Sequence, residues 1–224
     1  MSGNRENRGI PLRGLLCFAA MAASQLLCYY LPRLFLPHMA PHIMTVPLDA
    51  HIPLSPPWVV IYCLSFPFWI CSGLWIVSQE KRTAYRMTSA YVAAMLLSAA
   101  VFLIWPGTME RPAISGHDFF SEWLRLIYRL DAPTNLFPSL HVLITYFCWR
   151  GTMYCGGIPR WYRVFSFVFF LLVSCSVLLV KQHALVDVPA GILIGELSLQ
   201  LARVLRLERI PFAVDHHFHK ERTE

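Results

Sequence analysis

The sequence predicts an all-α protein that crosses a membrane six times. The first observation is composition: 56% of the 224 residues are hydrophobic and 14% are charged, whereas a soluble domain has about 25% charged residues. The second is a set of six apolar runs, each close to the roughly 20 residues that cross about 30 Å of hydrocarbon. The third is an uneven distribution of lysine and arginine between alternate connections.

The same composition excludes other classes of protein. A mean hydropathy of +0.49 is incompatible with a soluble globular domain or a disordered chain. The seven cysteines have no spacing typical of a disulfide framework. The net charge of +6 comes from basic residues scattered between apolar runs, so no nucleic-acid partner is expected. The sequence indicates no protein partner either.

The first predicted span follows Arg5, Arg8 and Arg13, and it could be taken for a secretory signal. We interpret it as a retained helix because the apolar run is too long for a signal core. The fourth span is interrupted by Arg150, but without it the lysines and arginines would not be concentrated on one side of the membrane. The predicted spans are residues 12–31, 57–78, 84–105, 139–155, 162–180 and 188–207.

Six spans place most basic residues on one side of the membrane. That side receives 14 of the 19: Arg5, Arg8, Arg13, Lys81, Arg82, Arg86, Arg150, Arg160, Arg163, Arg203, Arg206, Arg209, Lys220 and Arg222. The other side receives Arg33, Arg111, Arg125, Arg129 and Lys181. The positive-inside rule therefore predicts cytoplasmic termini, and we expect the protein in the plasma (cytoplasmic) membrane.

No repeat or composition shift divides the chain, so residues 1–224 are predicted to form one integral membrane domain. Two long connections, about 32–56 and 106–138, fall on the extracytoplasmic side. Apolar residues recur at helical spacing between Phe119 and Leu130, which predicts an amphipathic helix along the membrane surface. Glu196 lies inside the sixth span, where inward pairing is expected because a lipid-facing carboxylate is costly.

Histidine and carboxylate residues gather at the extracytoplasmic ends of the spans. His183 and Asp187 are four residues apart and can share one helix face. A carboxylate bound to one imidazole nitrogen leaves the other nitrogen free to act as a base or nucleophile. The alternative is that Asp187 only caps the sixth helix and that His183 is a polar loop residue.

Further candidate residues fall on the same predicted face. Ser139 and His141 begin the fourth span, where free amides and the helix dipole favour an anion such as phosphate. Arg111 and Lys181 add two cations. Together these groups provide a nucleophile, an orienting carboxylate, a general acid and a phosphate clamp, which suits phosphoryl transfer without metal or cofactor.

These motifs resemble those of the integral-membrane type 2 phosphatidic acid phosphatase superfamily over about residues 56–207. The matching residues are Pro138, Ser139 and His141 of its second motif, Ser176, His183 and Asp187 of its third, and Arg111 and Pro112 of its first. Ile104 and Val177 stand where the family has lysine and arginine, and Lys181 is a candidate substitute. The residues around Pro138 and His183 are similar to those of the branch of the superfamily that includes inositol phosphorylceramide synthases and sphingomyelin synthases.

The resemblance implies a six-span helix bundle and a phosphohistidine mechanism. In it His183 attacks phosphorus, Asp187 orients the ring and His141 protonates the leaving oxygen, while Arg111, Ser139 and Lys181 bind the phosphate. It favours a lipid phosphatase acting on a phospholipid or polyprenyl (pyro)phosphate. Head-group transfer between lipids is the alternative, because either water or an alcohol could attack the intermediate.

Two alternatives come from other classes. Six spans with ionisable residues would suit a small-molecule or lipid transporter, although the polar residues lie at one face rather than at the midplane. The departures at Ile104 and Val177 would suit an inactive lipid-binding scaffold. The stretch His216, His217 and His219 has no carboxylate or cysteine at a metal-site spacing, so no metal site is predicted there.

Overall fold

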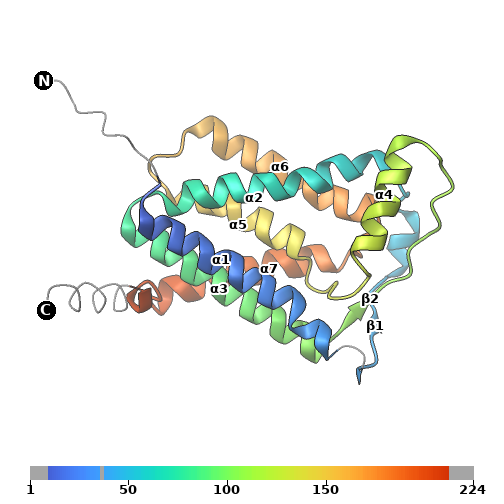
Figure 1. Ribbon diagram of the computed structural model, residues 1–224, viewed down its shortest axis with the longest axis horizontal. Coiled ribbons are helices and arrows are strands. Elements are labelled where there is room, and N and C mark those ends of the chain that lie inside the picture. Colours follow the sequence, from blue (N-terminus) through green and yellow to red (C-terminus); the bar gives the residue numbers. More distant parts are fainter. Residues whose placement is uncertain (1–9, 36–37, 212–224) are drawn as a thin grey trace, which may run out of the picture.

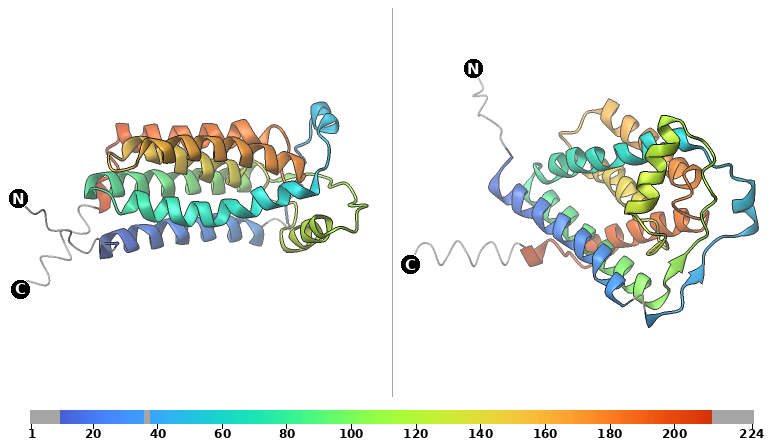
Figure 2. Two further views of the ribbon diagram at one scale, coloured as in Figure 1. Left: turned by 90° about the horizontal axis from the view of Figure 1, so that it is seen from above. Right: turned by 45° about the vertical axis from the view of Figure 1, so that its right-hand side comes forward.

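The computed structural model describes residues 10–35 and 38–211, and these residues are mostly helical. The long helices are α1 (Leu12–Tyr30), α2 (Val59–Val77), α3 (Lys81–Ile104), α5 (Leu140–Tyr154), α6 (Arg160–Leu179) and α7 (Asp187–Val204). They lie side by side in one bundle (Figures 1 and 2). Each coincides with one of the six predicted apolar runs, and the His216–His219 stretch lies outside the described residues.

Four of the described helical segments are long and apolar enough to cross a membrane: Leu12–Leu34, Pro56–Val77, Lys81–Ile104 and Arg160–Leu179. They match the first, second, third and fifth predicted spans, and they indicate a membrane protein. The fourth and sixth differ from this pattern. Helix α5 has only 15 residues, and the 18 residues of α7 include Asp187, Glu196 and Arg203.

Helix α5 is largely shielded by its neighbours, whereas only six of the 18 residues of α7 are buried. Helix α5 packs against α2, α6 and α7, and ten of its 15 residues are buried. Helix α7 also packs on α3. Glu196 of α7 accepts hydrogen bonds from Tyr146 (2.7 Å) and from Nε of Arg150 (3.1 Å) on α5. The expectation that Glu196 is paired is therefore confirmed, and the pairing lowers the cost of its charge beside apolar surface.

The two long connections form the end of the bundle opposite the start of α1 (Figure 2). The first contains η1 (Pro32–Leu34), β1 (His42–Ile43), η3 (Pro47–His51) and η4 (Pro56–Trp58), and the second contains β2 (Gly107–Thr108) and α4 (Phe119–Leu130). β1 pairs with β2 in parallel and aligns His42 with Gly107. This pairing ties the first connection to the loop that carries Arg111.

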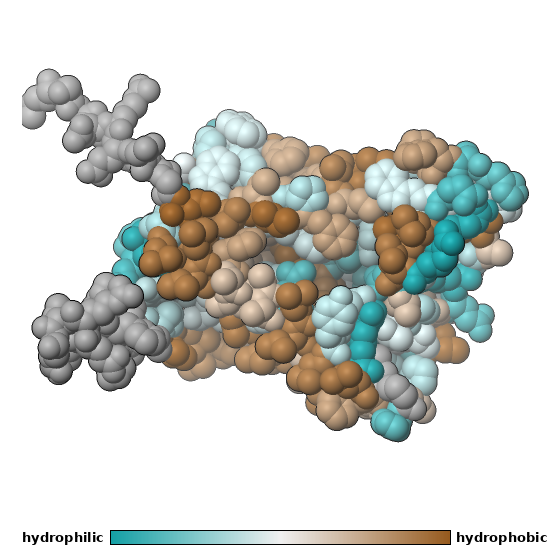
Figure 3. All heavy atoms as spheres, viewed as in Figure 1, coloured by the Kyte–Doolittle hydropathy of each residue, from teal (hydrophilic) through white to brown (hydrophobic). Residues whose placement is uncertain are grey.

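Helix α4 confirms the predicted amphipathic helix. The carboxylate of Asp118 caps it by accepting from the backbone N–H groups of Phe120 (3.0 Å) and Ser121 (3.2 Å). Leu124 is buried against the bundle, whereas Phe119 and Leu130 are exposed. Figure 3 shows hydrophobic side chains along the flank of the bundle and hydrophilic ones around α4 and its loop.

Candidate active site

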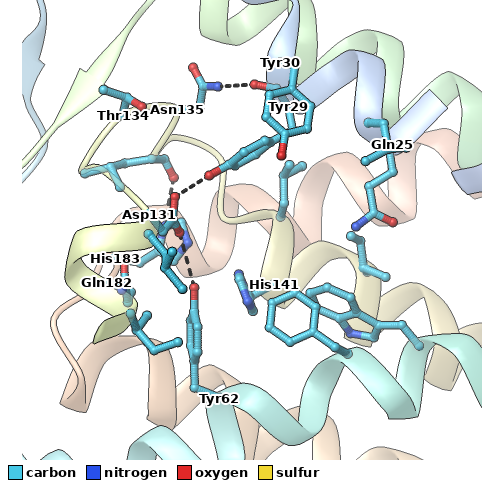
Figure 4. A pocket seen from close by; sticks show the side chains of 18 residues that line it. Gln25, Tyr29, Tyr30, Tyr62, Asp131, Thr134, Asn135, His141, Gln182 and His183 are labelled. Carbon is cyan, nitrogen blue, oxygen red and sulfur yellow. Dashed lines mark hydrogen bonds between the residues drawn. The ribbon is translucent and has the colours of Figure 1, made fainter. Parts of the chain in front are cut away.

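The predicted site residues lie at the end of the bundle where α5 and α7 begin. His141 is the second residue of α5, Asp187 is the first of α7, and His183 is in the loop between α6 and α7. A cavity of about 420 Å³ lies beside both histidines, with α1, α2, α4, α5 and the loops before α5 and α7 as its walls. Figure 4 shows the polar side chains that surround it.

His183 and Asp187 form the predicted pair. Nδ1 of His183 is 3.2 Å from Oδ2 of Asp187 and 3.0 Å from the carbonyl oxygen of Leu136. Because both neighbours are acceptors, Nδ1 is the donor, and Nε2 is the ring nitrogen left for another group. Oδ2 also accepts from the N–H of Ala184 at 2.8 Å, and Asp187 is fully buried. The carboxylate therefore caps the turn before α7 and holds the imidazole as well.

His141 is held by aromatic rings rather than by hydrogen bonds. Its ring stacks on Tyr62 of α2 at 4.1 Å between centroids, and the Phe66 and Trp69 rings lie at 5.4 and 5.0 Å. Its Nε2 atom is buried and has no hydrogen-bond partner. The rings of His141 and His183 are 6.1 Å apart at their centroids, so one tetrahedral group between them could contact both.

Other polar atoms of the cavity wall also lack partners. Oδ1 of Asn135 and Nε2 of Gln182 are buried and unpaired, and both residues line the cavity with His141. Buried polar atoms are rarely left unpaired in folded proteins. Three such atoms therefore belong to residues that line this one cavity.

Arg111 lies behind the cavity wall. Its guanidinium donates to the carbonyl of Asp131 (2.7 Å) and to the side-chain oxygen of Gln182, which itself lines the cavity. Arg111 lines a neighbouring outer cavity of about 760 Å³. Burial lowers the pKa of this guanidinium, but an arginine stays charged in proteins. The charge of Arg111 therefore reaches the cavity beside the histidines only through its hydrogen bond to Gln182.

Ser139 and Lys181 are not brought to the cavity. Ser139 is fully buried and caps α5, because its hydroxyl oxygen accepts from the N–H of Val142 at 3.3 Å. Lys181 donates to the carbonyl of Asp49 at 2.9 Å and lines the outer cavity. The structure thus gives Lys181 a role in joining loops, and it does not support the predicted substitution of Lys181 for a motif cation.

Asp131 is a site residue that the sequence analysis missed. Its carboxylate accepts from the hydroxyl of Tyr29, from Arg33 (3.0 Å) and from the hydroxyl of Tyr62 (3.5 Å). These partners come from α1, η1 and α2, far from Asp131 in sequence, so no local pattern signals the cluster. Of the described residues that line the cavity, only Asp131 is an aspartate, glutamate, lysine or arginine.

No family model matches the chain, and comparison with curated proteins finds no match. The fold and the site define a helical membrane protein with a histidine pair, an orienting carboxylate and a cavity beside them. A histidine held by a carboxylate, with a second imidazole beside it, is an arrangement that nucleophilic catalysis requires.

Proposed function

We propose that this protein is a membrane lipid phosphatase of the type 2 phosphatidic acid phosphatase superfamily. It removes phosphate from a phospholipid or a polyprenyl (pyro)phosphate through a phosphohistidine. One observation carries the proposal: the Nε2 lone pair of His183, fixed by Asp187, and the unpaired Nε2 of His141 belong to rings that lie beside the same cavity. Both groups are needed for attack on phosphorus and protonation of the leaving oxygen.

The proposal includes a bundle of six spans. Helices α5 and α7 are the two that length and composition alone do not qualify. The burial of α5 among α2, α6 and α7, and the packing of α7 on α3 and α5, support a crossing. A helix surrounded by other helices needs fewer apolar residues than one that faces lipid. We place both termini in the cytoplasm of a plasma-membrane protein, with the site on the extracytoplasmic side.

In the first step, Nε2 of His183 forms a bond to phosphorus and the bond from phosphorus to the lipid oxygen breaks. His141 takes a proton from the bound phosphate group and gives it to that oxygen, so the lipid leaves as an alcohol. The developing imidazolium charge on His183 is stabilised by Asp187, whose carboxylate oxygen lies 3.2 Å from Nδ1. Asp187 thus acts in both positioning and charge stabilisation.

In the second step, a water molecule attacks phosphorus and the bond to Nε2 breaks. His141, now neutral, takes a proton from that water, and inorganic phosphate leaves. The phosphate charge is offset by the N-terminal ends of α5 and α7 and by Arg111 acting through Gln182. Ser139 contributes by capping α5 and thereby holding His141 in place.

Gly191 provides a test of the α5–α7 contact that sets this geometry. A Cβ atom on Gly191 would lie 2.7 Å from the carbonyl oxygen of Ser139, and backbone at this distance cannot yield. We expect Gly191→Ala to separate α7 from α5 and to lower the rate of phosphate release about 10²-fold, as misplacement by about 1 Å can. Gly156→Ala is the control, because a Cβ there meets nothing within 4 Å. A Gly191→Ala variant with wild-type activity would contradict the geometry.

The direct test of the function is phosphate release by purified protein in detergent, without added metal. The panel consists of phosphatidate, phosphatidylglycerol phosphate and polyprenyl pyrophosphate, with His183→Gln as the inactive comparison. Release that the variant lacks supports the phosphatase. Transfer of a labelled head group to an added lipid alcohol would show that the protein is a head-group transferase instead of a phosphatase. Vesicle transport that persists in His183→Gln would favour a transporter, and binding without any turnover would favour a scaffold.

A further inference from the structure

The cavity beside the histidines continues along α2 as an apolar slot. It follows α2 from Tyr62, which stacks on His141, to Trp69, two turns or about 10 Å further along the helix. Buried Ile144 of α5 forms part of its floor, and Leu26 of α1 belongs to the opposite wall. One end of the cavity therefore carries the histidines, whereas the rest is lined mainly by hydrocarbon and aromatic rings, with the amide of Gln25 as a polar exception.

This slot opens on the flank of the bundle. Leu26 is 58% exposed and Phe66 of α2 is 45% exposed, although both line the cavity. Helices α1 and α2 diverge toward the end that carries α4, and α5 is seen behind the gap (Figure 1). Both helices are long and apolar enough to cross a membrane. The opening thus faces the region that bilayer hydrocarbon would occupy.

A hydrogen-bonded bridge closes the slot at its polar end. The carboxylate of Asp131 accepts from the hydroxyl of Tyr29 on α1 and from that of Tyr62 on α2, so it links the two helices at the end toward which they diverge (Figure 4). Asn135 also donates to the carbonyl of Tyr29 at 2.9 Å. The bridge therefore forms part of the cavity wall near the histidines and joins α1 to α2 there.

We infer that the gap between α1 and α2 is a lateral binding site for the hydrocarbon tail of the substrate. The tail lies in the slot and the phosphate reaches the histidines beneath the Asp131 bridge, so the lipid need not leave the bilayer. The inference rests on the proposed function for the identity of the phosphate group. Apolar lining, an opening toward hydrocarbon and a volume of about 420 Å³ all suit an alkyl chain.

A second apolar cavity offers the competing location for a tail. It has a volume of about 550 Å³ and is lined by Leu16 and Cys17 of α1 and Leu96 of α3, with Ile210 beyond α7. Neither His141 nor His183 lines it. A tail bound there could not present its phosphate to the histidines, so the position of the tail distinguishes the two cavities.

The kinetic test narrows the opening with Leu26→Trp. We expect kcat/KM for a long-chain phosphatidate to fall about tenfold, while kcat/KM for a short-chain, water-soluble phosphatidate stays near the wild-type value. Leu27→Trp is the matched control, because Leu27 is 62% exposed on the same helix and does not line the cavity. An unchanged ratio between the two substrates in Leu26→Trp, or an equal fall in Leu27→Trp, would overturn the inference.

A binding test is independent of turnover. The His183→Gln variant is illuminated with a phosphatidate that carries a diazirine in its acyl chain, and the labelled peptides are mapped by mass spectrometry. Labels on α2 near Phe66 and on α5 near Ile144, reduced by Leu26→Trp, support the slot. Labels confined to Leu16 and Leu96 would overturn it. Labelling of the slot, together with a wild-type protein that releases no phosphate, would instead support the slot and refute the proposed phosphatase.

Discussion

Replacement of His183 by glutamine is expected to abolish phosphate release, with a fall of about 10⁴-fold or more. Glutamine fills nearly the same volume but has no lone pair that can attack phosphorus, so the covalent route is lost. His183 is nearly buried, with Nδ1 between the Leu136 carbonyl and Asp187. The amide N–H of glutamine can replace that donor and preserve the fold. The measurement is phosphate release in detergent together with the thermal unfolding midpoint.

His42→Gln is the matched control for this prediction. His42 lies in β1, where its ring stacks on Trp105 at 4.0 Å, and it does not line the cavity. We expect wild-type activity from His42→Gln. Substantial phosphate release by a folded His183→Gln protein would exclude His183 as the nucleophile.

His141→Gln is expected to lower turnover of an alkyl phosphate by about 10²- to 10⁴-fold, because the leaving alkoxide no longer receives a proton. We expect the rate of the first step to fall much less with p-nitrophenyl phosphate, because its phenolate leaves without being protonated. His183→Gln should lose activity on both substrates. The comparison is made by stopped-flow release of nitrophenolate and by phosphate release from the lipid.

The opposite pattern would reassign His141. If His141→Gln impaired nitrophenyl phosphate and alkyl phosphate equally in the first step, His141 would act in binding or folding rather than as a general acid. Tyr62→Phe is a useful control, since it keeps the ring that stacks on His141 and removes only the hydroxyl that donates to Asp131. We expect it to retain the substrate selectivity of the wild-type protein.

Hydropathy predicted which segments are helical more accurately than it predicted where each helix begins and ends. The first span was predicted at 12–31 and α1 covers Leu12–Tyr30, because the apolar run and the helix end together at the tyrosines. The third was predicted to begin at residue 84, but α3 begins at Lys81. Hydropathy marks the limits of the hydrocarbon, whereas a helix continues into the interface, where charged side chains are solvated.

The site was predictable where it depends on local spacing. His183 and Asp187 are four residues apart, and the turn between them brings imidazole and carboxylate together, as the sequence suggests. Arg111 and Lys181 were expected to bind phosphate beside the histidines. Both line the outer cavity instead, where Arg111 donates to Asp131 and Gln182, and Lys181 donates to Asp49. The Asp131 cluster could not be predicted from the sequence. It joins Asp131 to residues about 100 positions away, and only the packing of α1 brings them together.

The central claim is that a phosphoryl group is carried by Nε2 of His183, and it is tested most directly by trapping that adduct. His141→Gln with p-nitrophenyl phosphate should accumulate it, since the first step is spared and the second lacks its base. After an alkaline quench, mass spectrometry of the peptides should find an acid-labile phosphate on His183, matched by a burst of nitrophenolate. A nitrophenolate burst or continued turnover with no phosphate on His183, or with phosphate on another residue, would contradict the account.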